Sequence, residues 1–413
     1  MVRKGSMKRL GLLAIVFTGA VATGMVLIIM TKYAEGITCR DLASGVSTPC
    51  SHEGARQSGL PGLQVVRELQ TPGPVSSVLW SSDGTKLAAS SLGAGADLPF
   101  VFGAHIPSPF GSLITIWNAD GQVFRKLERP KPFFGALDTF AFVAGDKQIV
   151  APPSMQSNDL GFSVFDIDTG EILREIAGSY PGKPRNVNAA TVVATSHDQS
   201  LLALTFGRAL AQPVALYSTR DWSKIADLPE GPTNTAQRPK VFAFSKDNKF
   251  LAVGRVDDIA LIYDLANRHV MQRINVFPDR AGTGNSIAIH PEGSMIAVSS
   301  GDRAQNSKLP NGRVEIVTPR DLVRVFSIKG GSRLATYPEP SDGACCVTWS
   351  PDGRFLAFIT AYRVLHLWDP FGSRELTVEL SPRSSSLAFA FSPDGNQLAV
   401  GVGSNVRMYS ITP

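Results

Sequence analysis

Two of the four cysteines form a spaced pair whose chemistry can be judged from the sequence. Cys39 and Cys50 bound the stretch CRDLASGVSTPC. In an oxidising compartment, thiols at this spacing could close a small loop through a disulfide. Two unpaired thiols in a flexible tether fit the same residues equally well, so the sequence leaves both alternatives open.

The other two cysteines, Cys345 and Cys346, are adjacent in a stretch that is expected to be a strand. Successive side chains of a strand point to opposite faces of the sheet. We therefore expect two small core residues here, rather than a mutual disulfide or a metal site.

The motifs for enzyme chemistry are incomplete. HEGAR, which begins at His52, lacks the second histidine of a zinc protease, and GSYPGKP has the wrong spacing for a phosphate-binding loop. No Gly-x-Ser-x-Gly elbow occurs, and Asp166–Glu171, which looks like a calcium loop, is expected to be a turn between strands. Of the six histidines, only His105 remains a candidate binding residue. No metal or cofactor is expected.

A repeated phrase accounts for most of the chain. In CVTWSPDGRFLAFI an apolar run precedes a Ser-Pro-Asp-Gly turn, and a second apolar run follows it. Pro at the second position and Gly at the fourth suit a type I turn. Counting this one, the phrase occurs seven times with variations in the turn, around Asp83, Asp146, Asp198, Asp247, Glu292, Asp352 and Asp394. A phrase of two strands and a turn that returns at such intervals is typical of sheet units stacked into a ring or an array.

A third apolar run follows most of these phrases, such as SLITIWN or RVLHLWD. In the fifth unit either RVEIVT or LVRVFSI could fill this place, and the second leads better into the next strand. Apolar runs of this kind suit strands that are buried on both faces.

The units resemble the WD40 repeat, and Trp368-Asp369 is one literal Trp-Asp dipeptide. The Gly-His that opens a typical WD40 repeat is missing, so its hydrogen-bond network cannot be assigned here. The resemblance covers residues 63–413 and implies an all-β, seven-bladed WD40-type propeller that is monomeric and binds proteins. The seventh unit lacks an outer strand, and Leu63–Leu69 is the strand expected to complete it and leave no open edge.

Extra length in this architecture gathers on one face. Long connections fall at Ser91–Ser112, at Gly301–Arg313 and at Pro152–Asp159, between the second and third strands of their units. Insertions on one face of a repeat protein indicate a binding surface. The candidate partner-binding residues in these loops are Phe100, Phe102, His105, Phe110, Arg303, Lys308 and Arg313. The phenylalanines could equally fold back and cover the ring.

The N-terminus predicts a membrane anchor. Residues 10–30 carry no charge, and as a helix these 21 residues are long enough to span a bilayer. The basic segment 1–9 precedes them. Residues 31–62 are rich in Gly, Ser and Pro and are expected to be a flexible linker. A cleaved signal peptide is the alternative. Because Leu63–Leu69 runs from the turn side, we expect the anchor to approach that side, with the long loops facing away from the membrane.

Charge argues against a nucleic-acid partner. The chain has 40 basic and 35 acidic residues, and four of the bases lie before residue 10, so the remainder is nearly neutral. We expect a single-pass protein of a bacterial inner membrane with its propeller in the periplasm, acting as a protein-binding scaffold. The alternatives are a cytoplasmic propeller and a propeller enzyme of the lactonase, hydrolase or quinoprotein type, with a site in the central channel.

Overall fold

The structure is a computed structural model, and it describes the strands and tight turns of the chain. The described residues are 37–42, 44, 47–49, 61–92, 112–128, 140–151, 160–178, 192–205, 213–234, 237–278, 284–301, 305–308, 314–317, 322–338, 343–372, 374–380 and 388–412.

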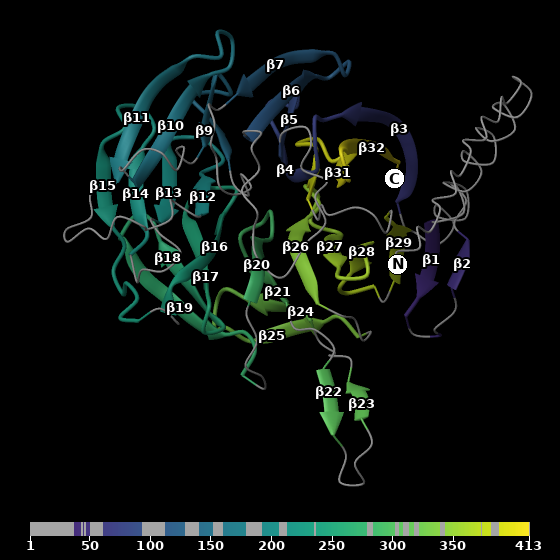
Figure 1. Cartoon of the computed structure of the whole chain (residues 1–413). Coiled ribbons are helices and arrows are strands. Elements are labelled where there is room, and N and C mark those ends of the chain that lie inside the picture. The colour runs from purple at the N-terminus through teal and green to yellow at the C-terminus, as the bar shows by residue number, and fades with distance from the viewer. Residues whose placement is uncertain are drawn as a thin grey trace, which may run out of the picture.

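The described residues form seven antiparallel blades of four strands each, arranged as a ring, and the sheet of blade 6 carries two further strands at its outer edge (Figure 1). This confirms the expected all-β propeller with seven blades. Within each blade we call the strands a to d from the innermost to the outermost. Blade 1 holds β4 (Val75–Trp80), β5 (Lys86–Leu92), β6 (Ser112–Asn118) and β7 (Val123–Glu128). Blade 2 holds β8 (Ala141–Val143), β9 (Gln148–Ala151), β10 (Leu160–Asp166) and β11 (Ile172–Gly178). Blade 3 holds β12 (Val192–Thr195), β13 (Leu201–Thr205), β14 (Ala215–Ser218) and β15 (Lys224–Asp227).

The remaining blades follow the same order around the ring. Blade 4 holds β16 (Pro239–Phe244), β17 (Phe250–Arg255), β18 (Ile259–Asp264) and β19 (His269–Asn275). Blade 5 holds β20 (Gly284–Ile289), β21 (Met295–Ser300), β24 (Val323–Ser327) and β25 (Arg333–Thr336). Blade 6 holds β26 (Ala344–Trp349), β27 (Leu356–Thr360), β28 (Val364–Asp369) and β29 (Arg374–Glu379). Blade 7 holds β30 (Phe389–Phe391), β31 (Gln397–Val402), β32 (Asn405–Thr412) and β3 (Gly62–Gln70).

The ring closes through β3, the strand expected to complete the last blade. β3 pairs antiparallel with β32, from Gly62 opposite Thr412 to Gln70 opposite Asn405. The register shifts between Val65 and Arg67, so Val66 lies in a bulge and Arg67 is the residue opposite Met408. The two ends of the propeller are thereby held in one sheet.

The core is divided among the blade junctions. The buried side chains of the described residues form seven clusters, and each cluster joins two adjacent blades. Leu356 of β27 and Trp368 of β28, for example, pack with Val323 and Val325 of blade 5. Because each blade packs on two neighbours, its middle strands are apolar on both faces, as the sequence pattern predicted.

The connections between strands a and b carry a left-handed residue at one fixed position. That position has a positive φ in all seven blades: Gly84, Asp146, Gln199, Asn248, Gly293, Gly353 and Gly395. Asp146 therefore occupies the position of Gly84, and not that of Asp83 as the sequence comparison assumed. In five of the turns a serine hydroxyl donates to the aspartate two residues on, as from Ser392 to Asp394 at 2.5 Å.

These turns also contact one another from blade to blade. Ser82 Oγ donates to Asp146 Oδ2 at 2.6 Å, Asp146 N–H donates to Gln199 Oε1 at 3.1 Å, and His197 N–H donates to Asn248 Oδ1 at 2.8 Å. Side chains at three of the left-handed positions thus hold their neighbours in place. We call the side of the ring with the a–b and c–d turns the turn face, and the side with the b–c and d–a connections the loop face.

The long connections lie where the sequence placed them. Residues 93–111 separate β5 from β6, and residues 152–159 separate β9 from β10, so both emerge on the loop face. In blade 5, β22 (Gln305–Lys308) and β23 (Val314–Val317) pair as a separate hairpin between β21 and β24. Figure 1 shows this hairpin projecting outward from the ring. Val323–Ser327 is therefore the third strand of blade 5, as expected.

The structure departs from the expected flexible linker at residues 37–49. β1 (Ile37–Asp41) pairs with β29 over five residues and adds a strand to the outer edge of blade 6, and β2 (Ser47–Pro49) pairs with β1 (Figure 1). The reason is that β29 offers an unpaired row of backbone groups, which a nearby extended segment can satisfy.

The direction of β1 corrects the expected approach of the N-terminal segment. Ile37 lies opposite Val378, and Asp41 lies opposite Arg374. Since β29 runs from the turn face to the loop face, the chain enters β1 at the loop-face end of blade 6 rather than at the turn face. Within the described ranges no helix is long and apolar enough to cross a membrane, and the expected anchor at residues 10–30 lies outside them.

Candidate functional site

The loop face differs from the turn face in the length of its connections. Blades 4, 6 and 7 join strands b and c by tight turns, whereas blades 1, 2, 3 and 5 have longer connections there. The tight turns of blades 4 and 6 place Asp258 and Arg363 at positive φ, which fits a short turn ending in a left-handed residue. Tyr362, at the tip of the blade 6 turn, is 66% exposed.

Most of the candidate partner-binding residues lie outside the described residues. These are Phe100, Phe102, His105, Phe110, Arg303 and Arg313. Lys308 is the last residue of β22 and lies opposite Val314. Cys39 lies in β1 opposite Leu376, and Cys50 falls outside the described range, so their disulfide stays a prediction.

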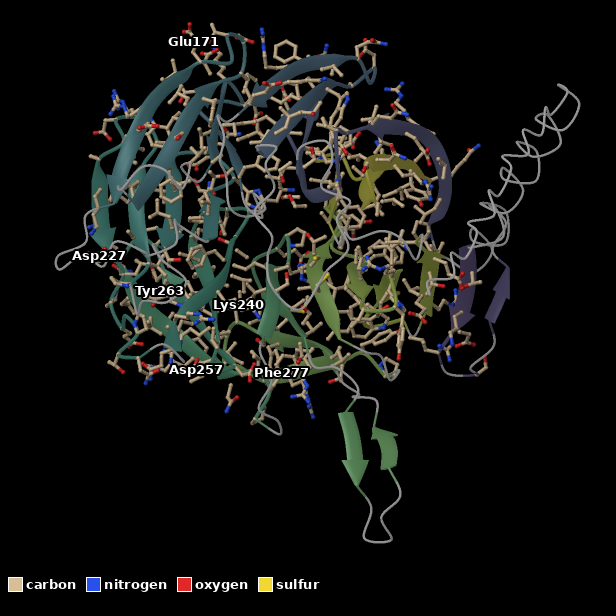
Figure 2. All side chains as sticks on the ribbon, in the orientation of Figure 1. Glu171, Asp227, Lys240, Asp257, Tyr263 and Phe277 are labelled. Carbon is tan, nitrogen blue, oxygen red and sulfur yellow. The ribbon has the colours of Figure 1, made fainter. Side chains whose placement is uncertain are left out.

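Blade 4 carries a polar sector on the loop face, which sequence reasoning did not single out. We define the sector as Glu230, Lys240, Arg255, Asp257 and Arg273. Arg255, at the end of β17, is buried, and its Nε lies 2.9 Å from Asp257 Oδ1 in the following turn. Arg273 of β19 forms an ion pair with Glu230 of the preceding connection. Figure 2 shows Asp257, Tyr263 and Lys240 on this blade.

Burial shifts the titration of two groups at this blade. Burial raises the pKa of Tyr263 to about 12, and the charge of Glu230 acts in the same direction. The Tyr263 hydroxyl stays protonated and donates to Pro229 O at 3.0 Å. Burial lowers the pKa of Lys240, although the charge of Asp258 opposes the shift. The ion pairs Arg255–Asp257 and Arg273–Glu230 hold four charges of the polar sector in fixed positions, which suits the recognition of a polar partner surface.

A second polar cluster is buried on the outer side of blade 6. Tyr337, which follows β25, donates from its hydroxyl to Glu375 Oε2 at 2.8 Å. His366 Nδ1 lies 3.0 Å from the same oxygen. Arg40 of β1 forms an ion pair with the other oxygen of Glu375, with 3.8 Å between Arg40 Nη1 and Glu375 Oε1. The hydroxyls of Thr38 and Thr377 form a hydrogen bond next to this contact. We call this cluster the blade 6 clasp.

One residue of the blade 6 clasp, His366, can be recognised from the sequence. His366 stands between two leucines in VLHLWD, so it is a polar residue inside an apolar strand, whereas RELTVEL alternates polar and apolar residues and nothing in it marks Glu375 as buried. Buried polar groups need hydrogen-bond partners, so His366 in this strand indicates a buried polar contact. Among the described residues, no group of three or more His, Cys, Asp or Glu side chains is placed to hold a metal ion.

The structure corrects one part of the expectation for Cys345 and Cys346: both pack against the core between blades 6 and 7, as expected, but their side chains do not point to opposite faces. The register of β26 against β27 shifts between Cys345 and Thr348, and Cys346 has a φ of +60°. This bulge breaks the alternation of side chains, so the two sulfur atoms lie on one side, 2.7 Å apart. Adjacent residues in a regular strand could not meet in this way.

Comparison with known proteins agrees with the fold. Residues 331–369 match the family model for the WD domain, G-beta repeat. These residues run from the turn before β25 to the end of β28, so they join the outer strand of blade 5 to the first three strands of blade 6.

Three relatives are similar over part of the chain. Transcription initiation factor TFIID subunit 5 of Caenorhabditis elegans is 25% identical over 170 residues, 41% of this chain and 23% of the relative. An uncharacterized WD repeat-containing protein of Synechocystis is 25% identical over 158 residues, 38% of each chain. Minichromosome loss protein 1 of Schizosaccharomyces pombe is 25% identical over 190 residues, 45% of this chain and 21% of the relative. The matches thus span no more than 38% of any of these relatives.

Proposed function

We propose that this protein is a protein-binding scaffold whose loop face receives the partner. The observation that carries the proposal is the contrast between the two faces of the ring. On the turn face, a–b turns contact one another through hydrogen bonds and leave short, uniform connections. On the loop face, four blades have extended connections, and blade 4 adds its polar sector. A rigid ring with variable loops suits recognition.

The similarities support the same class of function. A relative named as a subunit of a transcription initiation factor and a relative named as WD repeat-containing are each similar to part of this chain, which itself matches the WD domain model at residues 331–369. Because the matches cover a minor part of the relatives, they support protein binding in general and name no partner for this chain.

We further propose that residues 10–30 anchor the protein in a bacterial inner membrane, with the propeller in the periplasm. The uncharged run and the basic residues before it support this placement. Only residues 31–36 separate such an anchor from β1, a reach of about 25 Å at most. The rim of blade 6 would then lie near the membrane surface, and the ring could not turn freely on a long tether.

Two exposed aromatic residues of blade 6 offer a matched test of the binding face. Tyr362 lies on the loop face and is 66% exposed, and Phe371 lies on the turn face and is 61% exposed. Aromatic side chains often contribute most of the energy at protein interfaces. In affinity capture from detergent-solubilised membranes, we expect Tyr362→Ser, or replacement of residues 93–111 by a short Gly-Ser turn, to reduce partner recovery at least several-fold.

Phe371→Ser is the control and should leave recovery unchanged. Loss of the partner with Phe371→Ser, but not with either loop-face variant, would place the binding site on the turn face and contradict the proposal. The anchor is tested separately by fusing a reporter that is active only outside the cytoplasm after Pro413. An inactive reporter on a membrane-bound chain would contradict the periplasmic placement and would leave the binding-face result intact.

A further inference from the structure

The inner strand of blade 6 brings two adjacent thiols into contact. Cys345 lies opposite Ile359, the next paired residue of β26 is Thr348, and Cys346 sits in the bulge between them. A positive φ is uncommon for a residue other than glycine, and it persists only where the surrounding structure holds it. Here Cys346, at φ +60°, directs its sulfur towards that of Cys345.

The distance between the sulfurs indicates what the pair can do. At 2.7 Å the two atoms lie well inside van der Waals contact, yet farther apart than the about 2.05 Å of a disulfide bond. The neighbouring Cys345 side chain, together with burial, raises the pKa of the Cys346 thiol well above its usual value.

We propose that Cys345 and Cys346 form a redox site that interconverts between a dithiol and a vicinal disulfide. Because the Cys346 thiol holds its proton more strongly than an ordinary thiol, we assign Cys345 as the attacking residue and Cys346 as the resolving residue. The assignment needs no membrane anchor and no partner, so it stands apart from the function proposed above.

The oxidant we name is a disulfide, either of a small thiol such as glutathione or of a thiol–disulfide oxidoreductase. The Cys345 thiolate attacks one sulfur of this disulfide, forms a mixed disulfide and expels the first thiolate. The Cys346 sulfur then attacks Cys345 Sγ, the S–S bond to Cys346 forms, and the second thiolate leaves. The protons of the two cysteines end on the two leaving thiolates. The cysteine pair loses two electrons, which reduce the oxidant to two thiols.

The position of the two cysteines in the chain makes the oxidation reversible. β26 begins at the loop face, and the cysteines lie near that end, half-buried against the junction between blades 6 and 7. Adjacent Cα atoms lie 3.8 Å apart across a trans peptide, closer than the usual 4.4–6.8 Å of a disulfide. A disulfide between neighbours is therefore strained and easily reduced, so we expect a reversible reaction.

Trypsin offers a direct test, because cleavage after Arg333 and Arg354 releases both cysteines in one peptide, residues 334–354. The full chain in detergent, carrying Cys39→Ser and Cys50→Ser, is incubated with glutathione disulfide, alkylated and digested. We expect a linear peptide that is lighter than the dithiol by two hydrogens and carries no alkyl group. Treatment with dithiothreitol before alkylation should restore two alkylation sites.

Two outcomes would overturn the proposal. One is a peptide that still carries two alkyl groups after exposure of the folded protein to the oxidant. The other is disulfide formation that is as fast in urea as in the folded protein, because the bulge would then contribute nothing; we expect the folded protein to react at least tenfold faster.

An independent probe is phenylarsine oxide, whose arsenic binds two neighbouring thiols. We expect one equivalent to bind the same Cys39→Ser, Cys50→Ser protein. Adding either Cys345→Ser or Cys346→Ser should abolish this binding. Equal binding by a variant with a single cysteine would contradict a paired site.

Discussion

Glu375 on the outer strand of blade 6 lies opposite Arg40 of β1, with 3.8 Å between Glu375 Oε1 and Arg40 Nη1. The corresponding outer-strand positions of blades 1 and 2, Val123 and Ile172, are exposed. Glu375 is buried instead, because β1 covers it and because Tyr337 and His366 surround its other oxygen. An N-terminal segment is thus fixed to the propeller by an ion pair as well as by strand pairing.

The clasp predicts two unequal losses of stability. Glu375→Ala leaves Tyr337 and His366 without their shared acceptor, so we expect the free energy of unfolding to fall by about 2–4 kcal/mol. Arg40→Ala removes a partly exposed partner and should cost about 1 kcal/mol. Urea unfolding followed by tryptophan fluorescence measures both. Hydrogen exchange should also speed up at residues 37–41 in Arg40→Ala, and unchanged exchange there would show that the ion pair does not hold β1.

Two glycines at the same turn position predict different responses to one methyl group. Gly293 and Gly353 have φ values of +72° and +77°, so alanine costs about 1 kcal/mol of backbone strain at either site. A Cβ at Gly293 meets no atom within 4 Å, whereas a Cβ at Gly353 would lie 2.4 Å from His290 Nε2. His290 is buried beside Trp349, with ring centroids 4.8 Å apart. We expect Gly353→Ala to lose at least about 2 kcal/mol more than Gly293→Ala in thermal or urea unfolding, and equal losses would count against this packing.

Ring closure by β3 predicts a contrast within one strand. Leu69 is buried at the junction of blades 7 and 1, and Val66 is 52% exposed in the bulge. Truncating a buried leucine to alanine costs about 2–5 kcal/mol, whereas an exposed valine contributes little. Leu69→Ala should therefore clearly lower the free energy of unfolding measured in urea, and Val66→Ala should change it by less than about 0.5 kcal/mol. The reverse order would exclude the observed register of β3.

The serine–aspartate turns predict a loss of stability in acid. The hydrogen bond from Ser392 lowers the pKa of Asp394 below its usual 3.8, and it outweighs partial desolvation, which acts to raise it. The folded protein therefore holds the charged carboxylate more strongly than the unfolded chain does. This stabilisation is complete above about pH 4 and is lost as the pH falls through the lower pKa of the folded state.

Unfolding of Asp394→Asn measured between pH 2 and pH 6 tests this point. The variant should show a flatter decline of stability below pH 4 than the parent protein. Asp120→Asn, in a turn between strands c and d of blade 1, provides a comparison at an exposed carboxylate. An identical acid limb in the Asp394→Asn variant and the parent would mean that this turn does not stabilise the carboxylate.

Much of the fold could be predicted because its instructions are local and repeated. The acidic turn phrases, two of which read Ser-Pro-Asp-Gly, located the a–b connections, and the apolar runs on both sides identified strands buried on two faces. The missing outer strand of the last unit pointed to Leu63–Leu69, and β3 is that strand. The exception at Asp146 arose because the turn of blade 2 has no serine, so the nearest acid was aligned with the wrong position.

The candidate site could be predicted only in part, because binding loops carry no periodic pattern. Sequence reasoning placed the long connections on one face, and the strand order of blades 1, 2 and 5 agrees. It did not find the polar sector of blade 4, since Arg255 and Asp257 look like ordinary turn residues until burial and geometry pair them.

The sequence by itself determined the number of blades, their strand order and the closure of the ring, since each follows from periodicity and from counting strands. Only the tertiary structure decided that Arg40 meets Glu375, that β1 enters from the loop face, and that the sulfurs of Cys345 and Cys346 touch. The physical reason is that these contacts depend on a sheet edge left open by another blade and on a one-residue bulge. Neither has a signature in the order of the residues.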